Sequence, residues 1–380
     1  MNGAGGERTE NSPGQSATSW GNSSRDLAGE AYPPSMNRRW RFVVPAVTAA
    51  LIVSVAPSST AAGFDLTDVA QTDMSGVSPF ALSIDATTDR VFHSAGEAGG
   101  WLMSTCAVGG SCTDTALSPD FGSDYTQVTL TDGSQRAYFV LPDASGAKEI
   151  ATAPVTYAGG VPTLGATQRL GITATAQQRA WGVPDSVVTP DGRVRLYWVD
   201  EGENARFEPT GAQQRCLAKA LGRKGVAAVS SGKKVTSKAK KALKKCGVPL
   251  SALKSRGSRA NEIIVSATST DSSGTQFVRD SGTRTTGGYV DSDVIQAADG
   301  NWVMLLSTGP GEPPQRLFAA TSRDGLTWKV DKTPLTSASV NALDPTAIQT
   351  GPNSWRVYYA QSPKATPFSG HRLMVGTLTR

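Results

Sequence analysis

The sequence predicts an all-β protein built from five small antiparallel sheets, and three observations support this fold class. The 380 residues include 40 glycines and 22 prolines, which suits many short strands joined by turns. An Asp-Gly pair lies between two apolar runs at Asp132, Asp191 and Asp299, and this is the strongest short-range signal for a β-hairpin. The hairpins recur at intervals of roughly 50 to 60 residues, or twice that, which indicates stacked sheets rather than one continuous sheet.

The amino-terminal part of the chain predicts export. Residues 1–35 are rich in Asn, Ser, Gly and Glu, so they cannot bury enough apolar surface to fold, and we expect a disordered extension. Three arginines, an apolar run at 42–56 and small residues follow Met36, and this order is typical of a signal peptide over 36–62. Met36 is therefore the more natural start of the chain, with cleavage near Ala62 and a secreted, extracellular product. The alternative is an uncleaved apolar segment that anchors the protein in the membrane.

The four cysteines all follow the predicted signal peptide, and an even number suits an oxidising compartment. Cys106 and Cys112 bracket a five-residue loop, while Cys216 and Cys246 bracket a basic segment. We expect a disulfide in each pair. A zinc site is not predicted, because neither pair has CxxC spacing and neither of the two histidines sits near a cysteine pair.

The repeated unit is clearest over residues 289–335, where four short strands are predicted in about fifty residues. A degenerate copy fits over about 77–116, with strands near 80–84 and 91–92. The four clearer copies each have an acidic start, an apolar strand, a turn and a second strand, and they begin at Asp124, Pro184, Asp291 and Leu343. Five sheets are therefore expected within residues 64–380.

A strongly basic insertion separates two of the copies. Residues 206–260 hold 15 basic side chains and one acidic one, a net charge of +14, whereas the whole chain carries +5, so the remainder carries about −9. Two short helical patterns there end at Gly222 and Gly247, which predicts a small basic helical hairpin. Two interpretations of this insertion stay open: it attaches the protein to an anionic wall polymer or anionic lipid, or it is a solvated loop with no binding role. Nucleic acid is not expected as a partner, because aromatic stacking residues are not interleaved with the lysine run.

The acidic-start copies with Pro-Asp-Gly-type hairpins resemble the five-bladed β-propellers of the glycoside hydrolase family 43 superfamily, which includes arabinanase-, levansucrase- and invertase-like proteins. The resemblance covers roughly residues 77–380 and implies that the inner strands begin at the rim of a central pocket. The segments SRDGLTW (322–328) and STDSSGTQF (269–277) also look like the Asp-box turns of sialidase-type propellers. This second resemblance implies that Asp324 and Asp271 accept hydrogen bonds from backbone N–H groups in turns far from the pocket.

The resemblance makes the acidic starts candidate site residues. Glycoside hydrolysis needs two carboxyl groups beside the scissile bond, one protonated and one ionised. The candidate catalytic residues are Asp124, Asp185, Asp293 and Asp344, and the candidate substrate-binding residues are Trp181, Tyr289 and Asp291. The alternative is that each aspartate accepts backbone hydrogen bonds where an inner strand begins. Two departures from the family weigh against catalysis, because the first copy lacks an acidic start and no glutamate stands at the start of an inner strand.

The sequence therefore predicts a secreted, monomeric propeller that binds a glycan or polysaccharide in its central pocket. Hydrolysis is left open, and an enzyme of this kind is expected to be a glycoside hydrolase. The alternative function is a non-catalytic propeller that binds a cell surface or wall polymer and is tethered by its basic insertion. No cofactor and no metal ligands are predicted, and a structural cation in the central channel is left open.

Overall fold

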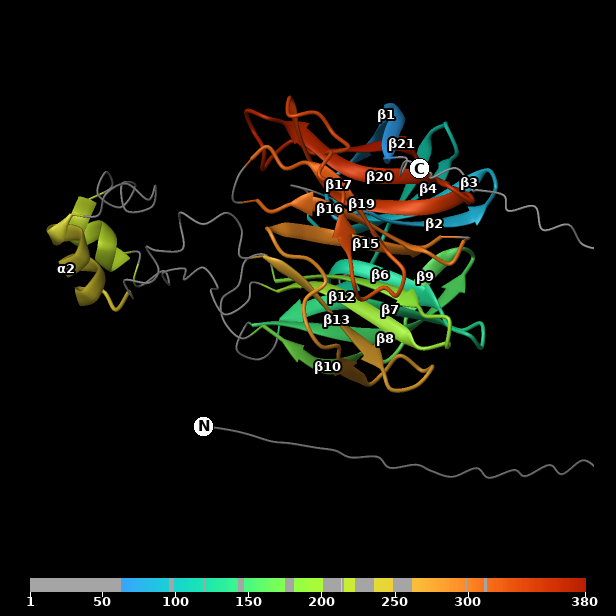
Figure 1. Ribbon diagram of the computed structural model, residues 1–380, viewed down its shortest axis with the longest axis horizontal. Helices are drawn as coiled ribbons and strands as arrows, with labels where there is room; N and C mark the ends of the chain where they lie inside the picture. Colours follow the sequence, from blue (N-terminus) through green and yellow to red (C-terminus); the bar gives the residue numbers. More distant parts are fainter. Residues whose placement is uncertain are drawn as a thin grey trace, which may run out of the picture. The chain divides into compact units, whose positions relative to one another are not determined.

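The computed structural model describes residues 63–95, 99–118, 121–142, 147–174, 181–200, 213, 215–222, 236–248, 262–297, 299–310 and 313–380. The predicted disordered extension and signal peptide lie outside these residues. Among the helices of the described part, none is long and apolar enough to cross a membrane. The described strands form five antiparallel sheets, here called blades 1 to 5, as the sequence predicted (Figure 1).

Blades 1 to 3 follow one another along the chain. Blade 1 contains β2 (Phe80–Asp85), β3 (Thr88–Ser94), β4 (Trp101–Ala107) and β5 (Cys112–Ala116). Blade 2 contains β6 (Ser123–Thr129), β7 (Gln135–Pro142), β8 (Lys148–Ala158) and β10 (Gln168–Thr173), with β9 (Val161–Leu164) also paired to β8. Blade 3 contains β11 (Gly182–Val188), β12 (Val194–Asp200), β13 (Ile263–Ser269) and β14 (Phe277–Arg279).

Blade 5 closes the ring with a strand from the other end of the chain. Blade 4 contains β15 (Tyr289–Gln296), β16 (Trp302–Thr308), β17 (Leu317–Ser322) and β18 (Lys329–Val330). Blade 5 contains β19 (Val340–Gly351), β20 (Ser354–Pro363), β21 (Arg372–Thr379) and, as its outer strand, β1 (Asp65–Ser75). Figure 1 shows β1 beside β21, and the two strands pair from Asp65 with Thr379 to Ser75 with Arg372. The first strands of the blades contact one another in turn, with β2 and β6 meeting through Phe80 and Tyr125, so β2, β6, β11, β15 and β19 are the inner strands.

The Asp-Gly hairpin turns form as the sequence predicts. Asp132 and Asp299 each accept a hydrogen bond from the backbone N–H two residues later, at 2.9 Å. The glycines that follow them, Gly133 and Gly300, have φ angles of 83° and 77°, which glycine adopts without the steric cost of a side chain. The turn therefore stabilises itself locally, whichever blade it belongs to.

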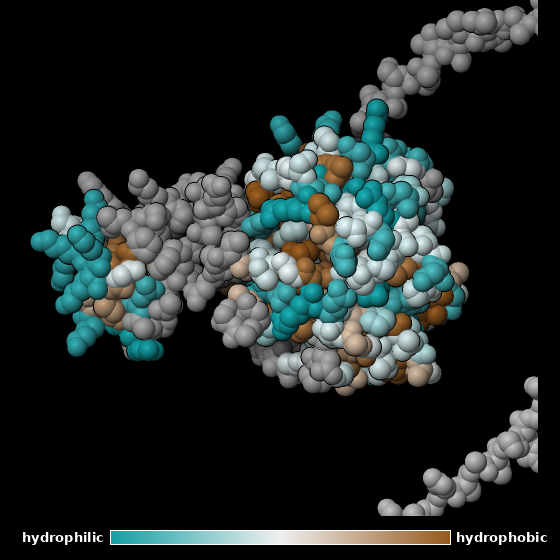
Figure 2. Space-filling view, turned by 90° about the horizontal axis from the view of Figure 1, so that it is seen from below, coloured by the Kyte–Doolittle hydropathy of each residue, from teal (hydrophilic) through white to brown (hydrophobic). Residues whose placement is uncertain are grey.

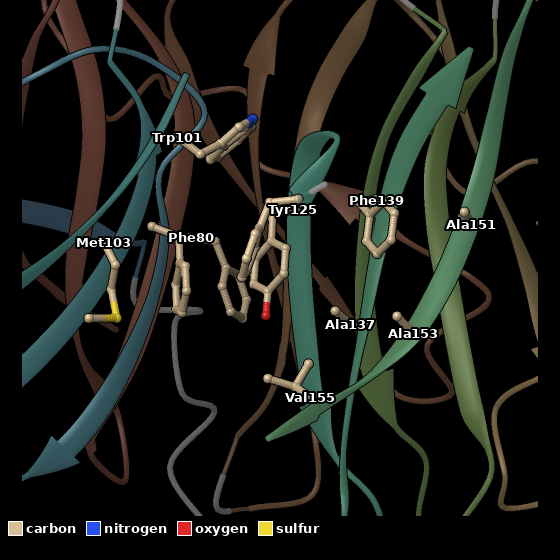
Figure 3. Packing of buried hydrophobic residues seen from close by; sticks show 11 residues of the cluster. Phe80, Trp101, Met103, Tyr125, Ala137, Phe139, Ala151, Ala153 and Val155 are labelled. Atoms are coloured by element: carbon tan, nitrogen blue, oxygen red, sulfur yellow. The ribbon is translucent and has the colours of Figure 1, made fainter. Parts of the chain in front are cut away.

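Each pair of neighbouring blades has its own apolar core. Between blades 1 and 2, Phe80 of β2 and Phe92 of β3 pack on Tyr125 of β6, with ring centroids 5.8 and 4.8 Å apart. Figure 3 shows the rings of Phe80 and Tyr125 together with Trp101 and the small side chains of β7 and β8. Equivalent clusters lie between the other four pairs of neighbouring blades. Each large buried side chain stabilises the folded state by about 1.5–3 kcal/mol, so blade contacts dominate the stability of the ring.

A buried charged pair joins blade 5 to blade 1. Arg356 of β20 donates from Nε and Nη2 to the Asp89 carboxylate of β3, at 2.5 and 2.6 Å. The Tyr358 hydroxyl donates to the same carboxylate at 2.7 Å, and Asp89 is 0 % exposed. These charged hydrogen bonds fix the blades that close the ring.

The two Asp-box-like turns behave as their sequences predict. Asp324 accepts hydrogen bonds from the backbone N–H groups two and three residues later, at 2.8 and 2.7 Å, and Asp271 accepts one from the N–H two residues later, at 2.9 Å. Both turns also contact the preceding blade, because the Tyr197 hydroxyl of blade 3 donates to the Gly325 carbonyl at 2.7 Å. The Tyr138 hydroxyl of blade 2 makes the equivalent bond, at 2.9 Å, to the turn that contains Asp271.

The described part of the basic insertion is a disulfide-linked helical hairpin. Helical residues 215–222 pack against α2 (Ser237–Lys245), which Thr236 caps at its start. A disulfide joins Cys216 to Cys246, and the other predicted pair, Cys106 and Cys112, is also linked. Apolar side chains from both helices form a small core, and the lysines of α2 are exposed. Figure 2 shows mostly hydrophilic colour on the described residues of this hairpin.

Candidate functional site

Five equivalent residues with positive φ, one in each blade, line the start of the inner strands. We call them the first ring: Ser78, Asp124, Val183, Asp291 and Asp344, with φ angles of 53°, 55°, 50°, 53° and 51°. In four of the blades a shift in strand register accompanies this residue. Non-glycine residues rarely adopt this conformation, and Asp does so more readily than most, which suits an acidic residue at three of the five positions.

The second ring lies two residues further along each inner strand and consists of Phe80, Thr126, Asp185, Asp293 and Thr346. Its polar side chains bridge neighbouring blades. Asp185 accepts a hydrogen bond from the Val294 N–H at 2.6 Å, and Asp293 accepts one from the Ala347 N–H at 3.0 Å. Thr346 accepts a bond from the next blade in the same way, from the Ala81 N–H at 3.2 Å.

The two second-ring aspartates are buried, with exposed fractions of 5 % for Asp185 and 8 % for Asp293. Burial raises the pKa of Asp185 to about 7. Burial and the nearby Asp185 carboxyl group raise the pKa of Asp293 well above its usual value. Thr126 also donates to Asp185, at 3.3 Å. Both side chains thus act as acceptors for strand N–H groups, which is the alternative role that the sequence left open.

The first-ring aspartates form a different network. Asp344 accepts a hydrogen bond from the Ser78 N–H at 2.8 Å, and it is also hydrogen-bonded to Asp291. The Ser307 hydroxyl donates to Asp291. Burial, followed by the charge of Asp291, raises the pKa of Asp344 well above its usual value, so this carboxyl group holds a proton more strongly than an exposed aspartate.

Asp124 has a different electrostatic environment. Burial raises its pKa, but the Lys148 ammonium opposes that rise, and the Ser78 hydroxyl donates to the carboxylate at 3.3 Å. Lys148 itself donates to the Trp181 carbonyl at 2.8 Å, which holds the cation near the inner strands. Lys148 and Ser78 were not predicted from the sequence, because neither belongs to an acidic start and only the folded ring brings them to Asp124.

All five predicted aspartates line one small cavity. It has a volume of about 40 Å³, and its lining also includes Ser78 and the prolines that follow three of the first-ring residues. This volume has room for a few water molecules but not for an enclosed sugar ring. A glycan would therefore have to lie over the mouth of the cavity. Within the described residues, no group of three or more His, Cys, Asp or Glu side chains has an arrangement that could hold a metal ion.

The two predicted aromatic residues lie elsewhere. Trp181 is 2 % exposed and packs in the core between blades 2 and 3. Tyr289 is half-buried, and its ring packs edge-on against Phe318 with centroids 5.4 Å apart. Neither residue lines the aspartate cavity. Their positions before acidic starts are explained by blade packing, which gives aromatic side chains most of their stabilising effect.

Comparisons with known proteins agree with the fold. No protein-family model and no curated protein matches the chain. Among solved structures, a thermostable family-43 glycoside hydrolase is similar with a TM-score of 0.51 and 11% identity, over 80% of this chain and 92% of that chain. An endo-1,4-beta-xylanase from Bacteroides thetaiotaomicron is similar with a TM-score of 0.52 and 10% identity, over 80% of this chain and 90% of that chain. The chain therefore has the five-bladed β-propeller fold seen in family-43 glycoside hydrolases.

Proposed function

We propose that this exported protein binds carbohydrate over the mouth of the aspartate cavity and hydrolyses a glycosidic bond there. The observation that carries the proposal is the contrast between two first-ring carboxyl groups on one cavity. Asp344 has a carboxyl neighbour, Asp291, while Asp124 has an ammonium neighbour, Lys148. Environments that push two carboxyl pKa values apart are those that assign an acid and a base.

In this mechanism Asp344 is the general acid. Its raised pKa favours the protonated form, which can donate a proton to the leaving-group oxygen as the glycosidic bond breaks. Asp124 is the second carboxyl group that the reaction requires, as base toward water or as nucleophile, because the Lys148 ammonium opposes the rise of its pKa and so favours its ionised form. Asp291 is a positioning residue, because its hydrogen bond to Asp344 holds that carboxyl group and its charge raises the pKa of Asp344.

Asp185 and Asp293 have a structural role in this proposal. Each uses an oxygen to accept a strand N–H from the next blade, and each is less than a tenth exposed. Their substitution is therefore expected to change stability more than turnover. This divides the four candidate catalytic aspartates into two that react and two that support the inner strands.

The test combines substrate choice with isosteric variants. The purified protein is incubated with aryl glycosides and with plant and cell-wall polysaccharides, and then compared with Asp344→Asn and Asp124→Asn. Asparagine keeps an acceptor oxygen for the Ser78 groups, so the fold is retained while proton transfer is lost. On polysaccharides, whose leaving groups need protonation, each variant should lose roughly 10²–10⁴-fold in kcat.

Leaving-group dependence separates the two roles. An activated aryl glycoside needs little protonation of its leaving group, so Asp344→Asn should retain most activity on it, whereas Asp124→Asn should lose activity on every substrate. Asp299→Asn, in an exposed hairpin turn, is the matched control. If the unaltered protein turns over no substrate, or if both variants are fully active, the hydrolase proposal is wrong.

A second candidate function is attachment to an anionic polymer through the basic lobe, defined here as residues 206–260. It is favoured because the described part of the lobe has its own core and disulfide, with every lysine of α2 exposed. The flanking strands pair directly, Asp200 with Ile263, so a short turn can replace the lobe without disturbing blade 3.

The lobe-deleted protein is compared with a full-length form in which the five lysines of α2 are changed to glutamine. Both should lose salt-sensitive retention on teichoic-acid-type or anionic-lipid surfaces, because screening weakens exposed charge attraction. Turnover of small aryl glycosides should remain. Retention that is unchanged in both forms would remove this function.

A further inference from the structure

A second, larger pocket lies beside the aspartate cavity, between blades 5 and 1. Its volume is about 630 Å³, within the size range of small-molecule binding sites. Three segments line it: residues 75–77 before β2, residues 94–95 after β3, and residues 368–372 before and at the start of β21. Val77 lines this pocket and the next residue, Ser78, lines the aspartate cavity, so the two are adjacent along the chain.

The three segments are tied together by backbone hydrogen bonds. Gly76 donates to the His371 carbonyl at 3.3 Å, and Ser94 donates to the Val77 carbonyl at 3.0 Å. A Cβ atom on Gly76 would lie 1.8 Å from the Ser94 carbonyl oxygen, so only glycine allows this close approach. The Asn341 side chain also holds the loop before β21, through the Pro367 carbonyl at 3.0 Å. The pocket is therefore formed before any ligand binds, which lowers the entropy that binding costs.

The lining chemistry suits a sugar. Phe368 is 67 % exposed, and the other exposed large apolar side chains of the described chain are aliphatic. The exposed ring of Phe368 offers a flat apolar surface, and the C–H face of a pyranose ring has a matching surface. Three serines, at positions 75, 94 and 369, supply hydroxyl groups around it.

The charge of the pocket favours an acidic sugar. Arg372 is exposed and lines the pocket, and none of the described lining residues is acidic. His371 adds little charge near neutral pH, because burial lowers its pKa. A guanidinium group binds a carboxylate through two parallel hydrogen bonds, a geometry that a neutral sugar cannot use.

We propose that this pocket is a binding subsite for an acidic sugar unit, a hexuronate, of a glycan that extends toward the first ring. Phe368 stacks on the sugar ring and Arg372 pairs with its carboxylate. The inference deepens the proposed function, since it names the substrate class for the same face of the propeller. It needs only binding, so it can be tested without turnover.

The test is calorimetric titration of Asp344→Asn, which should bind without cleavage, with an oligogalacturonate trimer and with xylotriose as the neutral counterpart. The acidic trimer should bind more tightly than xylotriose. Phe368→Ala should weaken binding of both sugars by roughly fivefold or more, because stacking is lost. Arg372→Gln should remove the preference for the acidic trimer, whereas Arg323→Gln, in the turn before β18, lowers the net charge equally and should change nothing.

The outcomes separate the two proposals. Binding that is unaffected by Phe368→Ala overturns the subsite, and an acidic preference that survives Arg372→Gln overturns the hexuronate. If neither the oligogalacturonate trimer nor xylotriose binds, the subsite is also overturned. If binding follows the prediction but the unaltered protein cleaves nothing, the subsite is supported and the hydrolase proposal fails. Thermal denaturation of each variant checks that the fold is intact.

Discussion

Substitution of Arg356 by alanine should destabilise the propeller far more than substitution of Arg193, although both arginines form ion pairs of nearly equal length. Arg356 lies 2.5 Å from Asp89, and Arg193 lies 2.6 Å from Asp191. The pairs differ in burial, because the Asp89 side chain is 0% exposed and the Asp191 side chain is 53% exposed. Burial, not distance, should therefore decide the difference in the free energy of unfolding.

The expected magnitudes follow from that difference. Removal of Arg356 leaves the Asp89 carboxylate buried with only the Tyr358 hydroxyl as a remaining side-chain donor among those described, and breaking such a pair costs roughly 3–5 kcal/mol. Removal of Arg193 leaves Asp191 in water, and an exposed pair contributes roughly 0–1 kcal/mol. The free energy of unfolding is measured by urea denaturation at pH 7 with several spectroscopic probes.

A double variant identifies the cause. Arg356→Ala with Asp89→Asn removes the buried charge as well as its partner, so it should be more stable than Arg356→Ala alone. If Arg356→Ala costs less than about 1 kcal/mol, or if the double variant is no more stable, a buried charge without its partner is not the cause of the lost stability.

Two further predictions concern the inner strands and the blade contacts. The folded-state pKa of Asp185 is raised to about 7, above the unfolded value near 3.8, so the stability that its protonation provides is present below pH 4 and is lost as pH rises toward 7. The free energy of unfolding should fall over this window by up to about 1.4 kcal/mol per pH unit for each proton, and Asp185→Asn should reduce the slope, as urea titrations at several pH values would reveal. Gly325→Ala should be more destabilising than Gly300→Ala by roughly 1–3 kcal/mol. Both glycines have positive φ, but only at Gly325 would the added Cβ lie 2.7 Å from the Arg195 side chain and 2.9 Å from the Tyr197 hydroxyl. Equal loss of stability in the two variants would mean that the turn does not dock on blade 3.

The five-sheet fold could be predicted because its signals are local. In the turns at Asp132 and Asp299 the aspartate side chain accepts a hydrogen bond from the backbone N–H two residues later. Because this bond lies within the turn, the same short sequence pattern marks the turn in each blade that has it. Strand β1 was not predicted as part of blade 5. Its residues are mostly exposed, and its partner β21 is about 300 residues away, so no local pattern marks the pairing.

The convergence of the aspartates could also be predicted, but not their division into two networks. That division depends on neighbours from other blades: the Val294 N–H at Asp185, the Asp291 carboxyl at Asp344 and the Lys148 ammonium at Asp124. These contacts are set by ring closure and by the positive φ of the first ring, which the sequence does not mark. For the same reason Trp181, which precedes an acidic start, was expected at the pocket but is buried between blades.

The pairing of β1 with β21 has a consequence for how the chain folds. Strand β1, the first strand of the described residues, can be placed only when β21 is available, because among the described strands it pairs with β21 alone. Blades 1 to 4 can form in the order of synthesis, whereas blade 5 forms only when β1 and β21 are both present. Non-local pairing of this kind is slow, so the edge of β21 and the amino-terminal strand stay open to other strands until the last step. Until β1 and β21 pair, a chaperone or a second copy of the chain would therefore have its easiest access to the incomplete ring at the free edge of β21.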